Sequence, residues 1–235
     1  MYDDVDIIAH KSIISTVLSE AFPRINEGKN IAYEINAING PTPIIKSSAE
    51  TNGIILMSAD AYKRINFTNN SVALSIFGNV YKRYEDIIPT LQDIEKILTK
   101  MGVLSISRSS VRKINIISFT SHADSLSGIF EDLFSPGIVN AIDSFPQPKA
   151  LKQNMHSTVF NENNFRLNIN YGVPEFDNTK KPLSGSVVID IDLLKNSISS
   201  ITEMINDTTI INNEIYNVFS WMVSQKMKEE IMGHE

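Results

Sequence analysis

The sequence contains no cysteine among its 235 residues. This absence excludes a disulfide framework, a zinc or iron–sulfur site with cysteine ligands, and a catalytic thiol. Long apolar runs are also missing, and none approaches the roughly 18 to 20 residues of a membrane-spanning helix. The segment 1–11 carries acidic residues where a signal peptide carries basic ones. We therefore expect a cytoplasmic protein with no membrane partner.

The sequence has fewer basic than acidic residues, with 21 Lys and Arg and 27 Asp and Glu, which gives a formal net charge of -6. A field of this sign repels nucleic acid and anionic membranes unless a local basic patch overrides it. The rest of the composition, with 42% hydrophobic and 20% charged residues, is typical of a globular chain that buries a sizeable core. General adhesion to polyanions is therefore not expected.

The first half of the sequence predicts a helix followed by an antiparallel meander, a second helix and a long strand. Period-2 alternation marks the strands, and apolar residues at i, i+4 and i+8 mark the helices. Asn69-Asn70 predicts a tight hairpin, since Asn tolerates a positive φ. The predicted helices span 10–22 and 80–100, and the predicted strands span 29–38, 54–58, 64–68, 71–77 and 103–119.

The second half predicts a helix, three strands and two closing helices. The polar turn 161–164 makes the first two of these strands a hairpin, and Asp207 or Thr208 is the expected N-cap of the last helix. That helix has a buried stripe of Ile211, Ile215 and Met222. The predicted helices span 124–134, 139–142, 193–205 and 208–231, and the predicted strands span 150–160, 165–171 and 185–192.

Strands followed by helices in both halves predict an α+β fold, with antiparallel sheets packed by helices on one face. The segment 145–148, which holds two prolines, is the best internal boundary. It divides the chain into an N-terminal half, 1–145, with the arginine-bearing strand, and a C-terminal half, 146–235. The pattern leaves open whether these are two similar domains or one continuous domain.

The strongest local feature is a basic stretch on the strand 103–119. No Asp or Glu occurs between Lys96 and Ala123, and one predicted face of the strand, otherwise core-like, carries two arginines. Arginine can hold a carboxylate or phosphate with two parallel hydrogen bonds. The predicted ligand-binding residues are Arg108, Arg112, Lys113 and Asn115. The alternative is that the arginines pair with carboxylates of the fold, those of the segment 84–86 or Asp190.

Other candidate chemistry is weaker. Asp190 and Asp192 lie two apart on a strand, which suits a divalent cation, but the sequence offers no third carboxylate and lysine in a nuclease order. Asp192 is also a suitable N-cap for the predicted helix from Leu193. The four histidines are far apart, and Ser121-His122 are neighbours that point to opposite faces of a strand. We therefore assign no catalytic residue, metal ligand or cofactor.

Five short segments occur in a characteristic order along the chain. They are Phe22-Pro23, the helix start Tyr81-Lys82-Arg83-Tyr84-Glu85, the Arg-x-x-x-Arg-x-x-Asn strand 108–116, the acidic strand end 187–192, and Asn217-Val218-Phe219. Their order resembles a sporadically distributed family of prokaryotic proteins of about this length. The resemblance spans nearly the whole chain, and at Ser110 and Lys113 the sequence departs from the Gly and the aromatic residue common in the family. The family implies no catalytic residues and suggests an accessory role in mobile or defence-type gene clusters.

Three functions follow as hypotheses. The first is a non-enzymatic binding or assembly protein, a homo-oligomer that serves as accessory subunit of a prokaryotic multi-protein system, with anti-phage defence as the suggested setting. It relies on open sheet edges that receive another chain. The second is a sensor of nucleic acid or another anionic ligand through Arg108, Arg112 and Lys113. The third is a metal-dependent hydrolase on Asp190 and Asp192.

Overall fold

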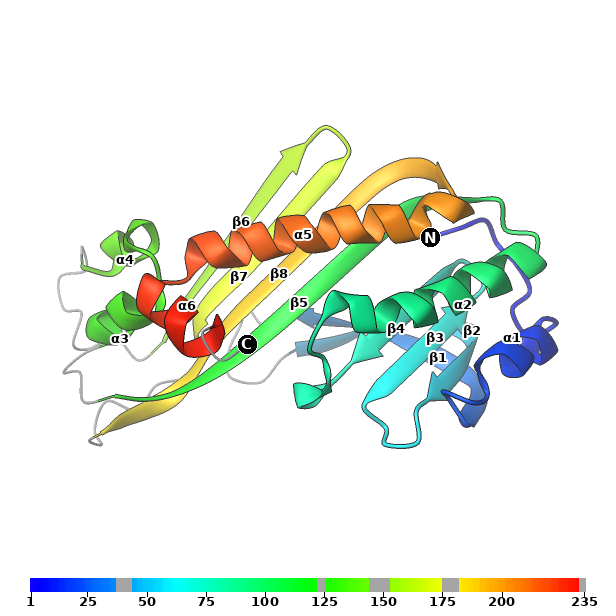
Figure 1. The fold of residues 1–235 in the computed structure, drawn as a ribbon, viewed down its shortest axis with the longest axis horizontal. Coiled ribbons are helices and arrows are strands. Elements are labelled where there is room, and N and C mark those ends of the chain that lie inside the picture. Colours follow the sequence, from blue (N-terminus) through cyan, green and yellow to red (C-terminus); the bar gives the residue numbers. More distant parts are fainter. Residues whose placement is uncertain (37–43, 122–125, 144–152, 175–181, 233–235) are drawn as a thin grey trace. The chain divides into compact units, whose positions relative to one another are not determined.

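The computed structural model describes residues 1–36, 44–121, 126–143, 153–174 and 182–232. They form two antiparallel sheets and several helices, which confirms the predicted α+β class (Figure 1). The first sheet has the order β1-β2-β3-β4 and the second the order β5-β8-β7-β6. The strands are β1 (Arg24–Asn36), β2 (Ile44–Met57), β3 (Lys63–Thr68), β4 (Ser71–Ile76), β5 (Ser105–Ser121), β6 (Asn154–Glu162), β7 (Phe165–Val173) and β8 (Leu183–Ser200). The helices are α1 (Lys11–Leu18), α2 (Ile88–Lys100), α3 (Leu126–Leu133), α4 (Pro136–Asp143), α5 (Met204–Met222) and α6 (Gln225–Met232).

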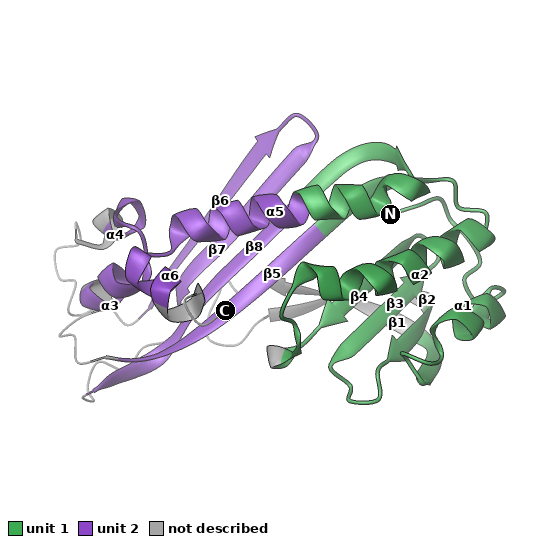
Figure 2. Cartoon of the chain, viewed as in Figure 1, with its two compact units in different colours: residues 1–36, 44–110, 194–210 green, residues 37–43, 111–193, 211–235 purple. Residues whose placement is uncertain are grey.

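The chain divides into two compact units (Figure 2). The first unit comprises residues 1–36, 44–110 and 194–210, and the second comprises 37–43, 111–193 and 211–235. Strands β5 and β8 and helix α5 each contribute residues to both units. The predicted boundary at residue 145 lies outside the described residues, so the predicted division into 1–145 and 146–235 stays a prediction.

In the first unit, α1 and α2 bury their apolar stripes against the sheet β1-β2-β3-β4. Ile94, Ile97 and Leu98 of α2 are buried with Ile14 and Leu18 of α1 in one core cluster. The spacing of i, i+3 and i+4 on α2 puts these residues on one face. A short 3-10 turn (Tyr84–Ile87) precedes α2, so the α-helix begins later than the predicted start at residue 80.

In the second unit, the helices pack on one face of the sheet β5-β8-β7-β6. Val187, Ile189 and Ile191 of β8 are buried against this helical layer, and Ile211 and Ile215 of α5 meet them in the same core cluster. The predicted stripe of α5 is therefore confirmed. The single predicted helix 208–231 is wrong, because the chain leaves the helix at Val223 and begins α6 at Gln225.

The predicted helix 193–205 is also wrong, because β8 continues as a strand to Ser200. A 3-10 turn (Ile201–Glu203) then leads into α5, and its capping box joins Ser200 and Glu203 through their backbone and side chains. Asp192 lies within the strand, so its predicted role as an N-cap is wrong. The predicted caps Asp207 and Thr208 lie inside α5, beyond its start at Met204.

The two faces of β5 are reversed from the prediction in the second unit. Val111, Ile117 and Phe119 pack against the core cluster, although the sequence favoured the other face. On that other face Ile116 is 67% exposed. The arginine-bearing face therefore does not pack on the helical layer.

Strands β6 and β7 form the predicted hairpin. Their register runs without interruption from Asn154 opposite Val173 to Glu162 opposite Phe165. Asn163 has a φ of 51° in the tight turn, a conformation that Asn tolerates better than most residues. The turn and the unbroken register fix which β6 side chains share a face with the core.

We predict that Gly172→Ala destabilises this hairpin. Gly172 has a φ of +141°, and a Cβ there would lie 1.9 Å from the backbone oxygen of Asn154. The backbone must shift to relieve this overlap, so the free energy of unfolding should fall by about 1 to 3 kcal/mol in chemical denaturation. Gly28→Ala is the matched control, since nothing lies within 4 Å of a Cβ at Gly28. Equal effects of both substitutions would contradict the close approach at Gly172.

No helix in the described part of the chain is both long enough and apolar enough to cross a membrane.

Candidate functional site

Arg112 forms a bidentate ion pair with Asp190. Arg112 Nε donates to Asp190 Oδ1 at 2.8 Å, and an outer guanidinium nitrogen donates to Oδ2 at 2.7 Å. The Asp190 side chain is 6% exposed and that of Arg112 is 39% exposed. The hydrogen bonds from Arg112 to Asp190 raise the pKa of Arg112, against the opposite effect of burial. The alternative interpretation of this arginine, pairing with Asp190, is thus what the structure shows.

The ion pair belongs to a polar row across three neighbouring strands. Asn168 of β7 donates to Asp192 Oδ2 of β8 at 3.2 Å, and Arg166 donates to the Asn168 side-chain oxygen at 3.0 Å. The charge of Asp192 also raises the pKa of Arg112. Each of these polar groups therefore has a partner within the sheet, which is the arrangement that makes a half-buried charge tolerable.

The two aspartates do not gather further metal ligands. No group of three or more His, Cys, Asp or Glu side chains that could hold a metal ion occurs in the described part of the chain. Both carboxylate oxygens of Asp190 accept hydrogen bonds from Arg112. The hydrolase hypothesis therefore lacks its third carboxylate among these residues.

The four predicted ligand-binding residues lie on two faces of β5. Neighbours on a strand point to opposite faces, so Lys113 and Asn115 lie on the face of β5 opposite to Arg112. Arg108 belongs to the first unit, where its side chain is exposed and makes no ion pair with any described residue. Its backbone oxygen accepts a 2.6 Å hydrogen bond from the amino terminus of Met1. Burial lowers the pKa of that amino terminus, and the charge of Arg108 adds to the effect.

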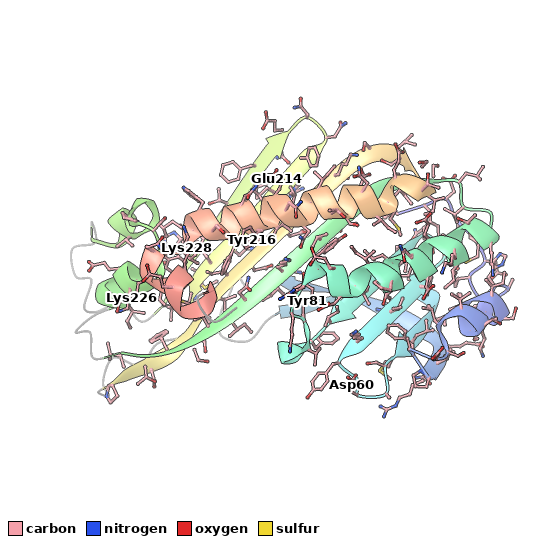
Figure 3. All side chains as sticks on the ribbon, viewed as in Figure 1. Asp60, Tyr81, Glu214, Tyr216, Lys226 and Lys228 are labelled. Atoms are coloured by element: carbon pink, nitrogen blue, oxygen red, sulfur yellow. The ribbon has the colours of Figure 1, made fainter. Side chains whose placement is uncertain are left out.

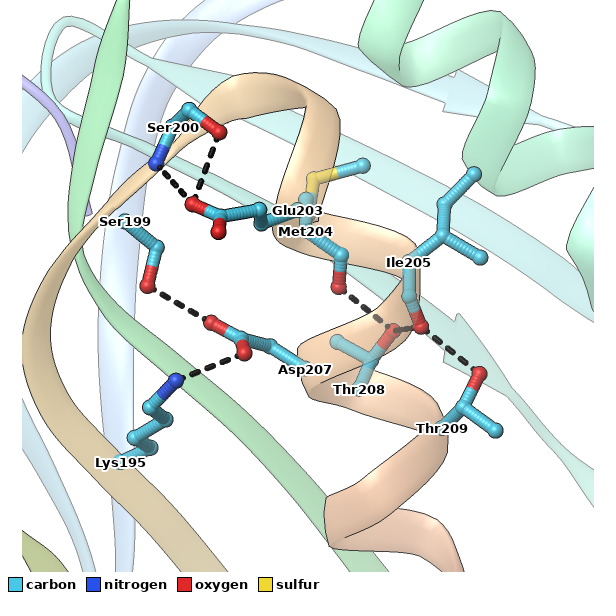
Figure 4. Close-up of polar contacts among 9 residues, drawn as sticks. All are labelled: Lys195, Ser199, Ser200, Glu203, Met204, Ile205, Asp207, Thr208 and Thr209. Carbon is cyan, nitrogen blue, oxygen red and sulfur yellow. Dashed lines mark hydrogen bonds and ion pairs between the residues drawn. The ribbon is translucent and has the colours of Figure 1, made fainter.

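A buried polar cluster that the sequence did not predict joins β8 to α5 (Figure 4). Lys195 Nζ donates to Asp207 Oδ1 at 2.7 Å, and Ser199 Oγ donates to Asp207 Oδ2 at 2.8 Å. Asp207 and Ser199 are buried. Because the serine hydroxyl donates to a carboxylate and is shielded from solvent, it is not a reachable nucleophile. The cluster links the end of β8 to the first turns of α5 through hydrogen bonds.

His156 is the histidine with the most distinctive surroundings. Its ring stacks on Tyr171, with centroids 4.9 Å apart and planes at 12°. Burial lowers its pKa, and its buried Nε2 has no hydrogen-bond partner among the described residues. The stack lies where β6 pairs with β7, next to the core residue Phe134, whose ring is 5.6 Å from that of Tyr171. His122 and Asp124, which with Ser121 would supply the residue types of a catalytic triad, lie outside the described residues.

Other charged side chains make local contacts (Figure 3). Asp60 accepts hydrogen bonds from the Ser58 hydroxyl and the Tyr62 backbone, and the Ser58 bond is the main reason that its pKa is lowered. Lys226 of α6 pairs with Asp132 of α3 at 2.8 Å. These contacts shape a turn and join two helices.

The outer edge of β6 is an exposed strand surface of the second unit. Within the described residues β6 pairs with β7 alone, at the end of the sheet. Residues 157–162 are exposed on both faces, with Val159 at 47% and Phe160 at 53%. Phe165 at the start of β7 is exposed beside them. We call Ser157–Glu162 together with Phe165 the β6 edge.

Comparison with family models, with curated proteins and with solved structures gave no match to this chain.

Proposed function

We propose that the protein is a non-enzymatic binding and assembly protein, an accessory subunit that accepts an extended strand of another chain at the β6 edge. The observation that carries this proposal is the regular, exposed outer strand β6. Its outward backbone N–H and C=O groups pair with no other strand among the described residues, so they are a template for one more strand.

The composition of β6 supports the proposal. Strands at the edge of a sheet are usually guarded by Lys, Pro or a bulge, which prevent pairing with other chains. The sequence of β6, NMHSTVFNE, has no Lys, Arg, Pro or Gly, and its register with β7 has no bulge. Val159 and Phe160 are residues of high strand propensity, and each leaves apolar surface exposed. An unguarded edge of this kind favours strand addition.

The polar groups described above agree with a binding role. Arg112, Asp190 and Asp207 each satisfy a structural partner, so none offers a free catalytic group. The setting, a prokaryotic multi-protein system of anti-phage defence, is proposed from the sequence resemblance alone. In this proposal the protein binds another chain through its edge strand and carries out no reaction itself.

The test replaces Val159 with a photo-cross-linking amino acid in the native host. We expect a covalent adduct with a protein after irradiation, because a strand paired with β6 lies within reach of that side chain. The same replacement at Ile116, exposed on β5 at the opposite end of the sheet, is the matched control. It should give little adduct because β5, although also an outer strand, carries Arg108, Arg112 and Lys113, and charged side chains disfavour pairing with another strand. A chain that cross-links to no protein through position 159 would contradict the proposal.

The second candidate function, a sensor of nucleic acid or another anionic ligand, depends on Arg108. Its exposed guanidinium has no ion pair among the described residues, so it is available to a phosphate. If purification from the host at near-physiological salt recovers nucleic acid alone, and Arg108→Ala abolishes this in a folded protein, the sensor replaces the assembly function. If Arg108→Ala recovered as much nucleic acid as the unchanged chain, a sensor that acts through Arg108 would be excluded.

A further inference from the structure

The β6 edge is complementary to itself. We infer that its occupant is the β6 strand of a second copy of this chain, paired antiparallel about a two-fold axis at Val159, so that the two sheets become one. This inference rests on the proposed function and names the partner strand. It is drawn from the register of the hairpin, the exposure of β6 and the position of its single charge.

The register decides which residues meet. In a continuous sheet with helices on one side, residues opposite each other must lie on the same face. A two-fold axis at Val159, near the middle of the exposed run 157–162, meets this condition. It pairs Val159 with its own copy, Thr158 with Phe160, Ser157 with Asn161, and His156 with Glu162. Every exposed residue of β6 then has a partner.

Apolar surface is buried on both faces. Phe160 lies opposite Leu167, which packs against the core, so Phe160 is on the helical face. Phe165 lies opposite Glu162, diagonally from Phe160 on that face. Across the axis the two Phe160 side chains are diagonal neighbours, about 7 to 8 Å apart at the backbone, which aromatic side chains span. On the other face the two Val159 side chains meet directly.

The charges also agree with this register. Glu162 is the only Asp, Glu, Lys or Arg in β6, and it lies at the end of the strand. In the two-fold pair the two Glu162 carboxylates are about 20 Å apart, at a rise of about 3.3 Å per residue. A register centred on Glu162 would place like charges face to face and is disfavoured. The single charge therefore favours a centre of pairing away from Glu162, as the axis at Val159 is.

Light scattering on the purified chain gives the direct test. We expect a mass twice the 26.3 kDa of one chain at micromolar concentration. Val159→Lys and Val159→Glu should each raise the dissociation constant by about 10-fold, because like charges would replace an apolar pair on the axis. A mixture of the two variants should dimerise again, since Lys then faces Glu. Ile116→Lys is the control and should stay dimeric.

A cysteine cross-link tests the register. The chain has no cysteine, so Val159→Cys introduces a single thiol. Residues directly opposite on antiparallel strands have Cα atoms about 4.5 to 5.5 Å apart, within the range of a disulfide. Mild oxidation should convert Val159→Cys to a covalent dimer much faster than Ile116→Cys. Equal rates would overturn the proposed centre of pairing.

The outcomes separate this inference from the proposed function. A monomeric chain whose position 159 still cross-links to a different protein in the host would overturn the second-copy inference and leave strand addition at β6 in place. A monomeric chain with no protein adduct at position 159 would overturn both. A dimer that both charged variants leave intact would overturn the inference too, because its interface must then lie elsewhere.

Discussion

Arg112→Met is expected to lower the free energy of unfolding by about 3 to 5 kcal/mol, because it leaves the Asp190 carboxylate buried without its partner. The carboxylate is 6% exposed and both its oxygens depend on the guanidinium. Urea denaturation followed by circular dichroism measures the change, with the slope of the transition checked for a constant value.

Arg108→Met is the matched control for this experiment. Arg108 lies on the same strand but is exposed, so its substitution should change stability by no more than about 0.5 kcal/mol. The double variant Arg112→Met/Asp190→Leu removes both charges and should recover much of the loss, because the orphaned carboxylate is gone. If Arg112→Met were as stable as Arg108→Met, the ion pair would contribute little and Arg112 would again be available as a ligand-binding residue.

Asp207→Ala is expected to lower the free energy of unfolding by about 3 kcal/mol. It removes the acceptor of both Lys195 and Ser199, and leaves an ammonium group and a hydroxyl group poorly solvated. The loss should appear as a lower midpoint of urea unfolding. Lys195→Met in the Asp207→Ala background should restore part of it by removing the unpaired charge.

Asp93→Ala is the comparison for Asp207→Ala, since Asp93 also accepts from a lysine, Lys96, at 2.9 Å. The Lys96 side chain is 64% exposed, and such surface pairs contribute about 0.3 to 0.5 kcal/mol. The contrast between the two aspartates isolates the effect of burial. Equal losses of unfolding free energy from the two substitutions would show that the polar cluster between β8 and α5 is exposed to solvent.

The hairpin β6–β7 and the stripe of α5 could be predicted because their signals are local. An Asn-rich turn between two alternating segments specifies a hairpin, and Ile211, Ile215 and Met222 recur with the helical period. The end of β8 could not be predicted in this way. Its inward face carries Lys195 and Ser199, whose partner is an aspartate on the next helix. These polar residues therefore interrupt the apolar alternation by which the end of β8 could have been recognised as a strand.

For the candidate sites, too, some features could be predicted from the sequence and others could not. Pairing of Arg112 with Asp190 was one of two interpretations of the sequence, but choosing between them requires knowing that β5 and β8 are neighbours. No local pattern encodes that long-range pairing. The same holds for the β6 edge, because the composition of β6 is visible in the sequence and its place at the end of the sheet is not. Strand order comes from tertiary packing.

The order β5-β8-β7-β6 has a consequence for synthesis of the protein. Strand β5 leaves the ribosome first and its neighbour β8 begins only at Leu183, about 60 residues after β5 ends at Ser121. At a synthesis rate of roughly 5 to 20 residues per second, about 3 to 12 seconds pass between the synthesis of β5 and the start of β8. During this interval the backbone of β5 is open to wrong pairing, and a chaperone that holds β5 would raise the yield of folded chain.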